Sequence, residues 1–287
     1  MVSPLTLMAV HAHPDDESIS TGGILARYAA EGVRTVLVTC TDGGCGDGDG
    51  GVKPGQEGHD RSAVVEARTA ELRASASVLG VTHLELLGYA DSGMMGWPEN
   101  DAVGAFWGVP VTEAAGRLAE LVRHYQPQVL VTYDPNGFYG HPDHIQAHRI
   151  TLEADRQTGT AAKLYYTAVP RSRMAEFGRR IQELGLDFGG EADGDGHDGD
   201  DAERRRGGGR EEWGTPDEDV TTYVDVAGHA DQKFESLQCH ASQSDNIFFL
   251  KMGRDVFGEL MGQEAFVRAV DRTGAALPED DLFAGLR

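Results

Sequence analysis

The chain has 287 residues, of which 40% are hydrophobic, and its 47 acidic residues against 25 basic ones give a formal net charge of −22. A chain of this length and composition can bury a sizeable core, and a single domain spanning residues 1–287 is the simplest organisation. The excess of negative charge argues against binding to nucleic acid or to an anionic membrane, and no stretch approaches the roughly 20 apolar residues that span a bilayer, so we expect a small-molecule partner.

The N-terminus and the cysteines indicate a reducing compartment. Residues 1–4 provide no basic segment ahead of a short apolar run, which is untypical of a secretory signal. Cys40, Cys45 and Cys239 are odd in number and too few for a disulfide scaffold. We therefore expect a cytoplasmic protein, and we leave open whether it forms a homo-oligomer.

Apolar runs alternate with amphipathic stretches along the chain. In order, we predict strand 5–10, helix 22–31, strand 35–40, helix 62–79, strand 84–87, helix 112–125, strand 129–133, helix 141–155, strand 163–169, helix 171–184, strand 220–226 and a final helix running toward residue 240. Strands separated by helices of this length imply an α/β fold with a Rossmann-like, mostly parallel sheet flanked by helices, and with a small C-terminal α/β portion. Ligands of such sheets bind at the carboxyl ends of the strands.

One stretch interrupts this alternation. Residues 189–214 hold glycine and charges of both signs with almost nothing apolar, and we expect an acidic, glycine-rich, disordered insertion over residues 189–218. Its segment DGDGHDGDD, residues 193–201, resembles a calcium-binding loop. The acidic or amide residue at the fifth position and the glycine after it are missing, so calcium binding is not expected.

Two polar clusters follow apolar strands. The segment HPDDE begins at residue 13, after the first predicted strand, and GHPDH begins at residue 140, after the fourth. In a parallel sheet both clusters would open on the same rim. Two neutral imidazoles and a carboxylate are a ligand set typical of catalytic zinc, with a fourth position open to water. Three of the following six residues are then expected to bind metal and the others to transfer protons: His13, Asp15, Asp16, His141, Asp143 and His144. The alternative is that an aspartate pair only caps the following helix.

Five segments together resemble the LmbE/PIG-L-type zinc deacetylases, which remove the N-acetyl group from N-acetylglucosamine conjugates. These segments are AHPDDE, RTAEL (68–72), DSGM (91–94), YDPNGFYGHPDH (133–144) and HASQ (240–243). The resemblance covers most of residues 5–170 and resumes at about residue 219. Its motifs are specific to the superfamily and much less so to one substrate.

The resemblance implies a role for each residue of the first cluster and for part of the second. His13, Asp16 and His144 would bind Zn²⁺, although Fe²⁺ can use the same ligands. Asp15 would be the general base that takes a proton from the attacking water and returns it to the leaving amine. A neutral amide is a poor electrophile, so a metal, a base and an oxyanion donor are all needed.

The remaining residues of the second cluster would stabilise the developing oxyanion. The resemblance implies that His141 does so or acts as an acid, and that Asp143 holds its tautomer through a hydrogen bond. Tyr139, two residues earlier, could supply a second donor to the tetrahedral intermediate.

Three further residues are candidates for contact with an amino-sugar substrate. The resemblance implies that Arg68 binds substrate hydroxyl or phosphate groups; the alternative is a solvent-facing salt bridge. Asp91 could bind sugar hydroxyls or be a turn aspartate. His240 could line the pocket or be structural.

The main hypothesis is a zinc-dependent hydrolase that deacetylates an N-acetylglucosaminyl compound, with the mycothiol precursor N-acetylglucosaminyl-inositol as substrate. The sister activity, cleavage of the amide in mycothiol S-conjugates, also fits. The segment YDPNGFYGHPDH and Ser20 resemble the deacetylase branch more, whereas LPEDDLFAGL (277–286) is equally near to the amidase branch. A deacetylase of a glycosylated secondary metabolite would use the loop 94–109, with Trp97, Phe106 and Trp107, as an aromatic pocket.

Two alternative hypotheses do not involve amide hydrolysis. A module that binds metal or sugar without catalysis would be favoured if Asp15 or His141 were absent, and both are present. A phosphoryl-accepting domain would use Asp15 and Asp16 to bind Mg²⁺, which prefers oxygen ligands over the imidazoles found here.

Overall fold

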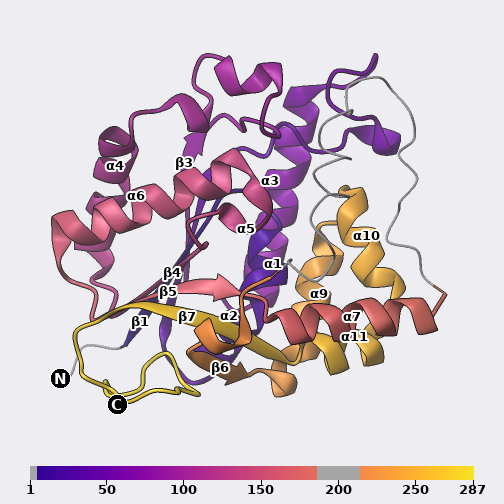
Figure 1. Cartoon of the computed structure of the whole chain (residues 1–287). Helices are drawn as coiled ribbons and strands as arrows, with labels where there is room; N and C mark the ends of the chain where they lie inside the picture. The colour runs from indigo at the N-terminus through magenta and orange to yellow at the C-terminus, as the bar shows by residue number, and fades with distance from the viewer. Residues whose placement is uncertain (1–4, 186–213) are drawn as a thin grey trace.

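A seven-stranded sheet forms the centre of the molecule (Figure 1), as seen in a computed structural model that describes residues 5–185 and 214–287. In chain order the strands are β1 (Thr6–His11), β2 (Arg34–Thr41), β3 (His83–Tyr89), β4 (Val129–Thr132), β5 (Lys163–Ala168), β6 (Thr222–Asp225) and β7 (Gln263–Asp271). Their order across the sheet is β3-β2-β1-β4-β5-β7-β6. Strands β1 to β5 are parallel, whereas β7 runs antiparallel to both of its neighbours.

Strand β1 is central and completely buried, because helices cover both faces of the sheet. This explains its nearly continuous apolar sequence, which is typical of a parallel strand with two buried faces. Its register places Leu7 opposite Thr35 of β2 and Val129 of β4.

Four long helices cover the two faces of the sheet (Figure 1). Helices α4 (Val111–Tyr125) and α6 (Pro142–Thr158) pack on one face, and α2 (Gly22–Ala30) and α3 (Arg61–Val78) pack on the other. Because neighbouring residues of a strand point to opposite faces, β1 contributes to both cores. Met8 and Val10 join the core under α4 and α6, while Leu7 and Ala9 join the one under α2 and α3.

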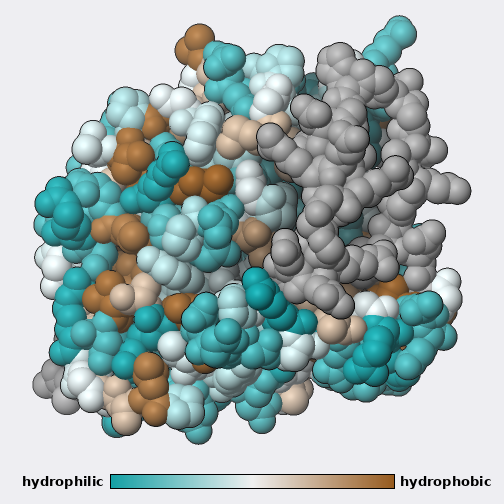
Figure 2. All heavy atoms as spheres, viewed as in Figure 1, coloured by the Kyte–Doolittle hydropathy of each residue, from teal (hydrophilic) through white to brown (hydrophobic). Residues whose placement is uncertain are grey.

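A third apolar cluster forms beside the sheet from the C-terminal helices. It unites α7 (Arg171–Glu183), α9 (Ala230–Cys239), α10 (Ser244–Lys251) and α11 (Gly253–Met261). Toward the viewer in Figure 2, the surface is mostly hydrophilic, with small separate hydrophobic patches, as the acidic composition predicts.

The site follows from the strand order. The chain leaves β1 toward β2 and leaves β4 toward β5, which lie on opposite sides of the β1–β4 pair. Adjacent parallel strands whose connections diverge leave a crevice outside their carboxyl ends. The short helices α1 (Asp16–Ser20) and α5 (Gly137–Gly140) follow these two strand ends.

The predicted fold class is confirmed, and most predicted elements are present within a few residues of their expected bounds. The sequence analysis did not predict α1 or the antiparallel β7. Residues 186–213, with the resemblance to a calcium loop, lie outside the described residues, and the rest of the expected insertion includes a short 3-10 turn at Asp217–Asp219. All three cysteines are described and free. Within the described part of the chain, no helix has the length and apolar character needed to cross a membrane.

Candidate metal centre and active site

The chain turns sharply between β1 and α1, and this turn presents the first cluster. Asp15 has φ 110°, an uncommon value for a residue other than glycine, and it stands at the position before α1. Its side chain makes no capping hydrogen bond to the helix, so the helix-capping alternative does not explain it. The carboxylate is instead available to the crevice.

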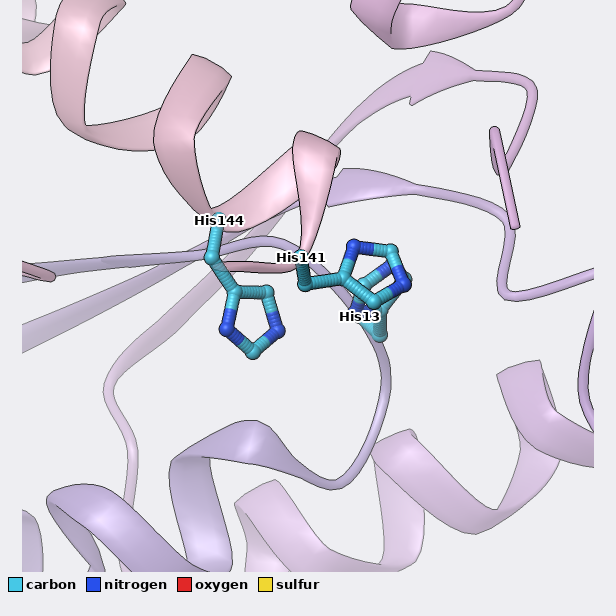
Figure 3. A group of neighbouring side chains, drawn as sticks. All are labelled: His13, His141 and His144. Atoms are coloured by element: carbon cyan, nitrogen blue, oxygen red, sulfur yellow. The ribbon is translucent and has the colours of Figure 1, made fainter. Parts of the chain in front are cut away.

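The start of α6 positions the side chains of the second cluster. His141 is the N-cap residue, and its Nδ1 accepts a hydrogen bond from the backbone N–H of Asp143 at 3.1 Å. Pro142 occupies the first turn, where its missing N–H leaves no helical bond unmade. Figure 3 shows His141 and His144 projecting from the start of α6, beside His13 from the end of β1.

The two clusters meet, as the sequence predicted. His13, His141 and His144 can each offer a ring nitrogen within 4.8 Å of the others. The Asp16 carboxylate bridges two of them, with Oδ2 3.3 Å from His13 Nδ1 and Oδ1 3.5 Å from His144 Nε2. Tetrahedral ligands bound at the usual zinc distances lie about 3.3 to 3.5 Å from one another. The two spacings involve different Asp16 oxygens, so the group whose ligand atoms lie together is His13, His141 and His144, with the Asp16 carboxylate beside two of them.

His144 provides the strongest sign of a missing ligand. Both of its ring nitrogens are buried and without a hydrogen-bond partner, which is costly for a polar group unless a ligand takes the place of water. The ring is held in place by Tyr133, on which it stacks with centroids 4.2 Å apart. The Tyr133 hydroxyl also donates a 2.7 Å hydrogen bond to Asp16 Oδ2. The donor set therefore fits a metal ion.

Asp143 corrects one expectation from the sequence. Its carboxylate was expected to hold the tautomer of His141, but its Oδ2 lies 3.3 Å from His13 Nε2 and accepts the backbone N–H of Ser92 at 2.9 Å. Only the backbone of Asp143 bonds to the His141 ring. A carboxylate behind a histidine is the usual way to orient a metal ligand, because it fixes which nitrogen carries the proton. Asp143 thus directs His13 Nδ1 toward Asp16.

Burial and neighbouring charges act against each other on the pKa values of His13 and Asp16, whereas burial and the neighbouring imidazoles act together on that of His141. Burial lowers the pKa of His13, but the carboxylates around it, Asp91 foremost, raise it well above its usual value. Burial likewise raises the pKa of Asp16, and the neighbouring imidazoles outweigh this effect and lower it well below its usual value. For His141, burial and the other two imidazoles together hold the pKa well below its usual value, which favours a neutral ring.

Asp15 is held from behind by two side chains. Arg68 Nη2 lies 3.2 Å from Asp15 Oδ2, and the Asn246 amide donates to the same oxygen at 3.1 Å. Burial raises the pKa of Asp15, and the opposing charge of Arg68 limits this increase. Arg68 is itself buried and donates to the carbonyls of Gly43 and Pro14. Arg68 is therefore not part of a solvent-facing salt bridge, which was the alternative interpretation of this residue.

The other two candidate substrate contacts lie deeper than expected. Asp91 is buried, accepts the backbone N–H groups of Cys45 and Gly93, and approaches His13 Nε2 to 3.6 Å. Asp91 therefore stabilises its turn, as the alternative interpretation predicted, and its carboxylate also lies beside the His13 ring. His240 is completely buried and bonds through Nε2 to Glu17 at 2.7 Å. A role for either residue in substrate binding stays a prediction.

Tyr139 lies over the imidazoles. Its ring centroid is 5.2 Å from that of His144 and 6.1 Å from that of His141, both in edge-on arrangements. About half of the side chain is exposed, so its hydroxyl can reach a bound molecule. Burial of the hydroxyl and the nearby Asp16 raise its pKa, so it remains protonated.

Two of the aromatic residues in the loop 94–109 pack against other parts of the protein. Phe106 is completely buried in the core and stacks on Tyr89 with centroids 5.0 Å apart. Trp107 is partly buried beneath Arg149, whose guanidinium lies 5.0 Å from its ring centroid. Phe106 therefore cannot line a substrate pocket.

Sequence reasoning missed three residues of the site. Tyr133 directly follows β4, and its position at the same strand end as the histidine cluster could have indicated it. Ser92 lies inside the DSGM motif, so it was within a quoted segment. Asn246 belongs to α10 and carries no local signal, because only packing brings it to Asp15.

Comparison with known proteins defines the class of this chain. Residues 8–155 match the family described as "PIG-L: GlcNAc-PI de-N-acetylase". The chain belongs to the PIG-L family, which confirms the resemblance seen in the sequence. Deacetylases of this family depend on a metal, in agreement with the cluster described above.

Three curated relatives share one name, 1D-myo-inositol 2-acetamido-2-deoxy-alpha-D-glucopyranoside deacetylase. The relative from Acidothermus cellulolyticus is 40% identical over 98% of this chain and 95% of its own length. That from Nocardiopsis dassonvillei is 41% identical over 97% of this chain and 100% of its own length. That from Thermobifida fusca is 43% identical over 83% of this chain and 82% of its own length.

Solved structures share the fold at lower identity. N,N'-diacetylchitobiose deacetylase from Pyrococcus horikoshii aligns with a TM-score of 0.57 and 19% identity over 93% of this chain and 84% of its own. GalB, the 4-carboxy-2-hydroxymuconate hydratase from Pseudomonas putida KT2440, aligns with a TM-score of 0.58 and 19% identity over 95% of this chain and 99% of its own. One fold thus carries both deacetylation and hydration, so these two structural matches support the fold and not the reaction.

Proposed function

We propose that this chain removes the N-acetyl group from 1D-myo-inositol 2-acetamido-2-deoxy-α-D-glucopyranoside, with zinc held by His13, Asp16 and His144. The observation that carries the proposal is identity of about 40% to relatives of that name along almost the whole chain. The site supports the same chemistry, because it combines a metal-binding set with a base and an oxyanion donor.

Zinc at this site would activate water for attack and polarise the amide carbonyl. The carboxylate of Asp15 performs the proton transfers. Arg68 and Asn246 both bind Oδ2, which leaves Oδ1 as the atom available to the attacking water. Because burial raises the pKa of Asp15, the carboxylate is a better base than an exposed aspartate. It then gives the proton to the leaving amine.

His141 stabilises the negative charge that develops on the amide oxygen. Since Nδ1 accepts the N–H of Asp143, the neutral ring carries its proton on Nε2 and can donate it toward the substrate. The lowered pKa of His141 keeps this neutral form at physiological pH. The protonated hydroxyl of Tyr139 supplies the second donor.

The structure accounts for the segment that is similar to the amidase branch. Leu282 and Phe283 are completely buried in the core with α2 and α3, and Glu279 forms a buried ion pair with Lys163. The segment therefore packs in the core of this chain, and its similarity to the amidase branch carries no argument about the substrate.

The test is release of free amine by the zinc-loaded protein from N-acetylglucosaminyl-inositol and, in parallel, from a mycothiol S-conjugate. We expect faster cleavage of the first. Faster cleavage of the S-conjugate would assign the chain to the amidases instead. The Asp15→Asn variant is the control, because it retains the fold and the metal ligands while losing the base.

A further inference from the structure

The turn before α6 holds a phenylalanine in an unfavourable backbone conformation. Phe138 has φ 64° and ψ −76°, which is the strained γ-turn conformation that residues with a side chain rarely adopt. Among the described residues, only Asp15, Gln126 and Phe138 combine a side chain with positive φ. Strain of this kind persists only where the surroundings impose it, and it often marks a functional site.

The surroundings of this turn do impose its shape. The Asp134 carboxylate accepts the backbone N–H of Asn136 at 2.6 Å and that of Phe138 at 3.2 Å. Gly137 packs so closely on α6 that a Cβ there would come within 2.8 Å of His144 Cβ. The turn is thereby tied to a proposed metal ligand. None of these contacts uses the Phe138 side chain, and glycine would adopt the same backbone without strain.

The Phe138 ring is not explained by core packing either. It remains 48% exposed, and it contacts the ring of Tyr139, at a centroid distance of 5.8 Å. Tyr139 in turn lies 5.2 Å from His144. Phe138 therefore contacts the aromatic ring that itself contacts His144.

The chemistry of the substrate indicates what this outer ring contacts. In a 2-acetamido sugar the amide nitrogen is attached to C2, next to the anomeric carbon, so the group on that carbon lies close to the scissile amide. Sugar and cyclitol rings present C–H faces that pack well on aromatic side chains. With the amide at the imidazole cluster, the attached ring extends toward the residues that border the cluster.

We infer that Phe138 is a specificity residue, whose ring receives the ring attached to the anomeric carbon of the amino sugar. This inference rests on the proposed deacetylase function and extends it to the part of the substrate that does not react. It predicts a preference for amino sugars that carry such a ring over N-acetylglucosamine itself.

The experiment compares the wild type with Phe138→Gly, Phe138→Ala and Phe138→Tyr, all loaded with zinc, on N-acetylglucosaminyl-inositol and on N-acetylglucosamine. We expect the glycine and alanine variants to lose about fivefold in kcat/KM on the inositol compound through a higher KM, the size of one aromatic contact. On N-acetylglucosamine the change should stay below twofold. The tyrosine variant keeps the ring and should retain the wild-type preference.

Thermal unfolding distinguishes the effect of losing the Phe138 ring from the effect of relieving the backbone strain at this position. Phe138→Gly should raise Tm by about 2 °C, because it relieves the positive φ, whereas Phe138→Ala keeps a Cβ and should not. Leu86→Ala, which removes a side chain of similar exposure from edge strand β3, is the control and should leave the substrate preference unchanged.

Several results would overturn the inference. An equal loss of kcat/KM on both substrates would mean that Phe138 has a general role. If the ratio of kcat/KM on the inositol compound to that on N-acetylglucosamine is unchanged in the glycine and alanine variants, Phe138 has no role in specificity. A lower Tm for Phe138→Gly with an unchanged ratio would make the ring structural. If the wild type releases amine from neither substrate, the proposed function itself is wrong and this inference falls with it.

Discussion

Two groups of buried charged side chains in this molecule differ in how completely they are bonded. The first lies under the C-terminal segment, where Lys163 and Glu279 are both fully buried. Glu279 Oε1 accepts from Lys163 and from Arg268, and Oε2 accepts from Tyr165 at 2.7 Å and from Thr222 at 3.2 Å. Each carboxylate oxygen therefore has two donors.

The second group is the imidazole and carboxylate cluster between β1 and β4. There both nitrogens of His144 and Oδ1 of Asp143 are buried without a partner, and Asp15 adopts positive φ. Buried polar atoms without partners and strained backbone both cost free energy. In these two groups, the fully hydrogen-bonded charges stabilise the fold, while the atoms without partners lie where we propose a bound metal. Variants in the two groups should therefore affect different properties.

The largest effect is expected for His144→Ala. Loss of a proposed ligand should remove the metal and reduce turnover by about a thousandfold. The Tm of the metal-free protein should also fall, because the variant removes a buried ring that stacks on Tyr133, so metal content and turnover are compared on folded protein. Metal analysis by mass spectrometry checks this, and wild-type metal content in the variant would contradict the ligand assignment.

Asp15→Asn should reduce turnover by about a hundredfold or more, the contribution of a positioned general base. The metal content should remain that of the wild type, because His13, Asp16 and His144 are intact. The measurement is kcat alongside metal content. A wild-type rate would exclude Asp15 as the base.

In the fully bonded group, Glu279→Gln should lower the free energy of unfolding by about 3 to 5 kcal/mol, since it leaves the buried charge of Lys163 without its counter-ion. The activity per folded molecule should be unchanged. Urea unfolding and activity at low temperature measure the two properties. The exposed pair of Glu153 and Arg156 provides the control, because Glu153→Gln should leave the unfolding curve unchanged. Loss of activity without loss of stability would contradict the purely structural role assigned to this group.

His141→Ala should reduce turnover by about a hundredfold, as removal of an oxyanion donor does, with metal retained. His141 also lies within reach of the same cation as His13 and His144. Metal content is therefore the decisive measurement: its loss in this variant, together with its retention in Asp16→Asn, would exchange the roles assigned to His141 and Asp16.

The smallest effect at neutral pH is expected for a change at Glu17, which follows Asp16 in the sequence. Burial raises its pKa, but His240 and Ser75 outweigh this and lower it from 4.5 to about 2. A depressed pKa contributes stability above the unfolded value, and this contribution is lost as the pH falls from about 4.5 toward 2. We expect the urea midpoint of the wild type to fall more steeply over that range than that of Glu17→Gln. Parallel curves would contradict the assigned pKa.

The sequence determined the ends of β1 and β4 and the chemistry placed there. The nearly continuous apolar sequence of β1 is typical of a parallel strand buried on both faces, and polar residues directly after it are expected at the strand end. The motifs HPDD and HPDH then supplied enough imidazoles and carboxylates to predict a metal site and its six candidate residues.

Which of these side chains face one another depends on how the chain packs in three dimensions. Asp143 is two residues from His141, yet its carboxylate meets His13, because the start of α6 turns it toward β1 and the Ser92 loop. Asn246 reaches Asp15 from α10, more than 200 residues away along the chain. Local sequence determines the conformation of each segment, whereas contacts across the sheet depend on strand order and helix packing, which act between residues far apart in the sequence.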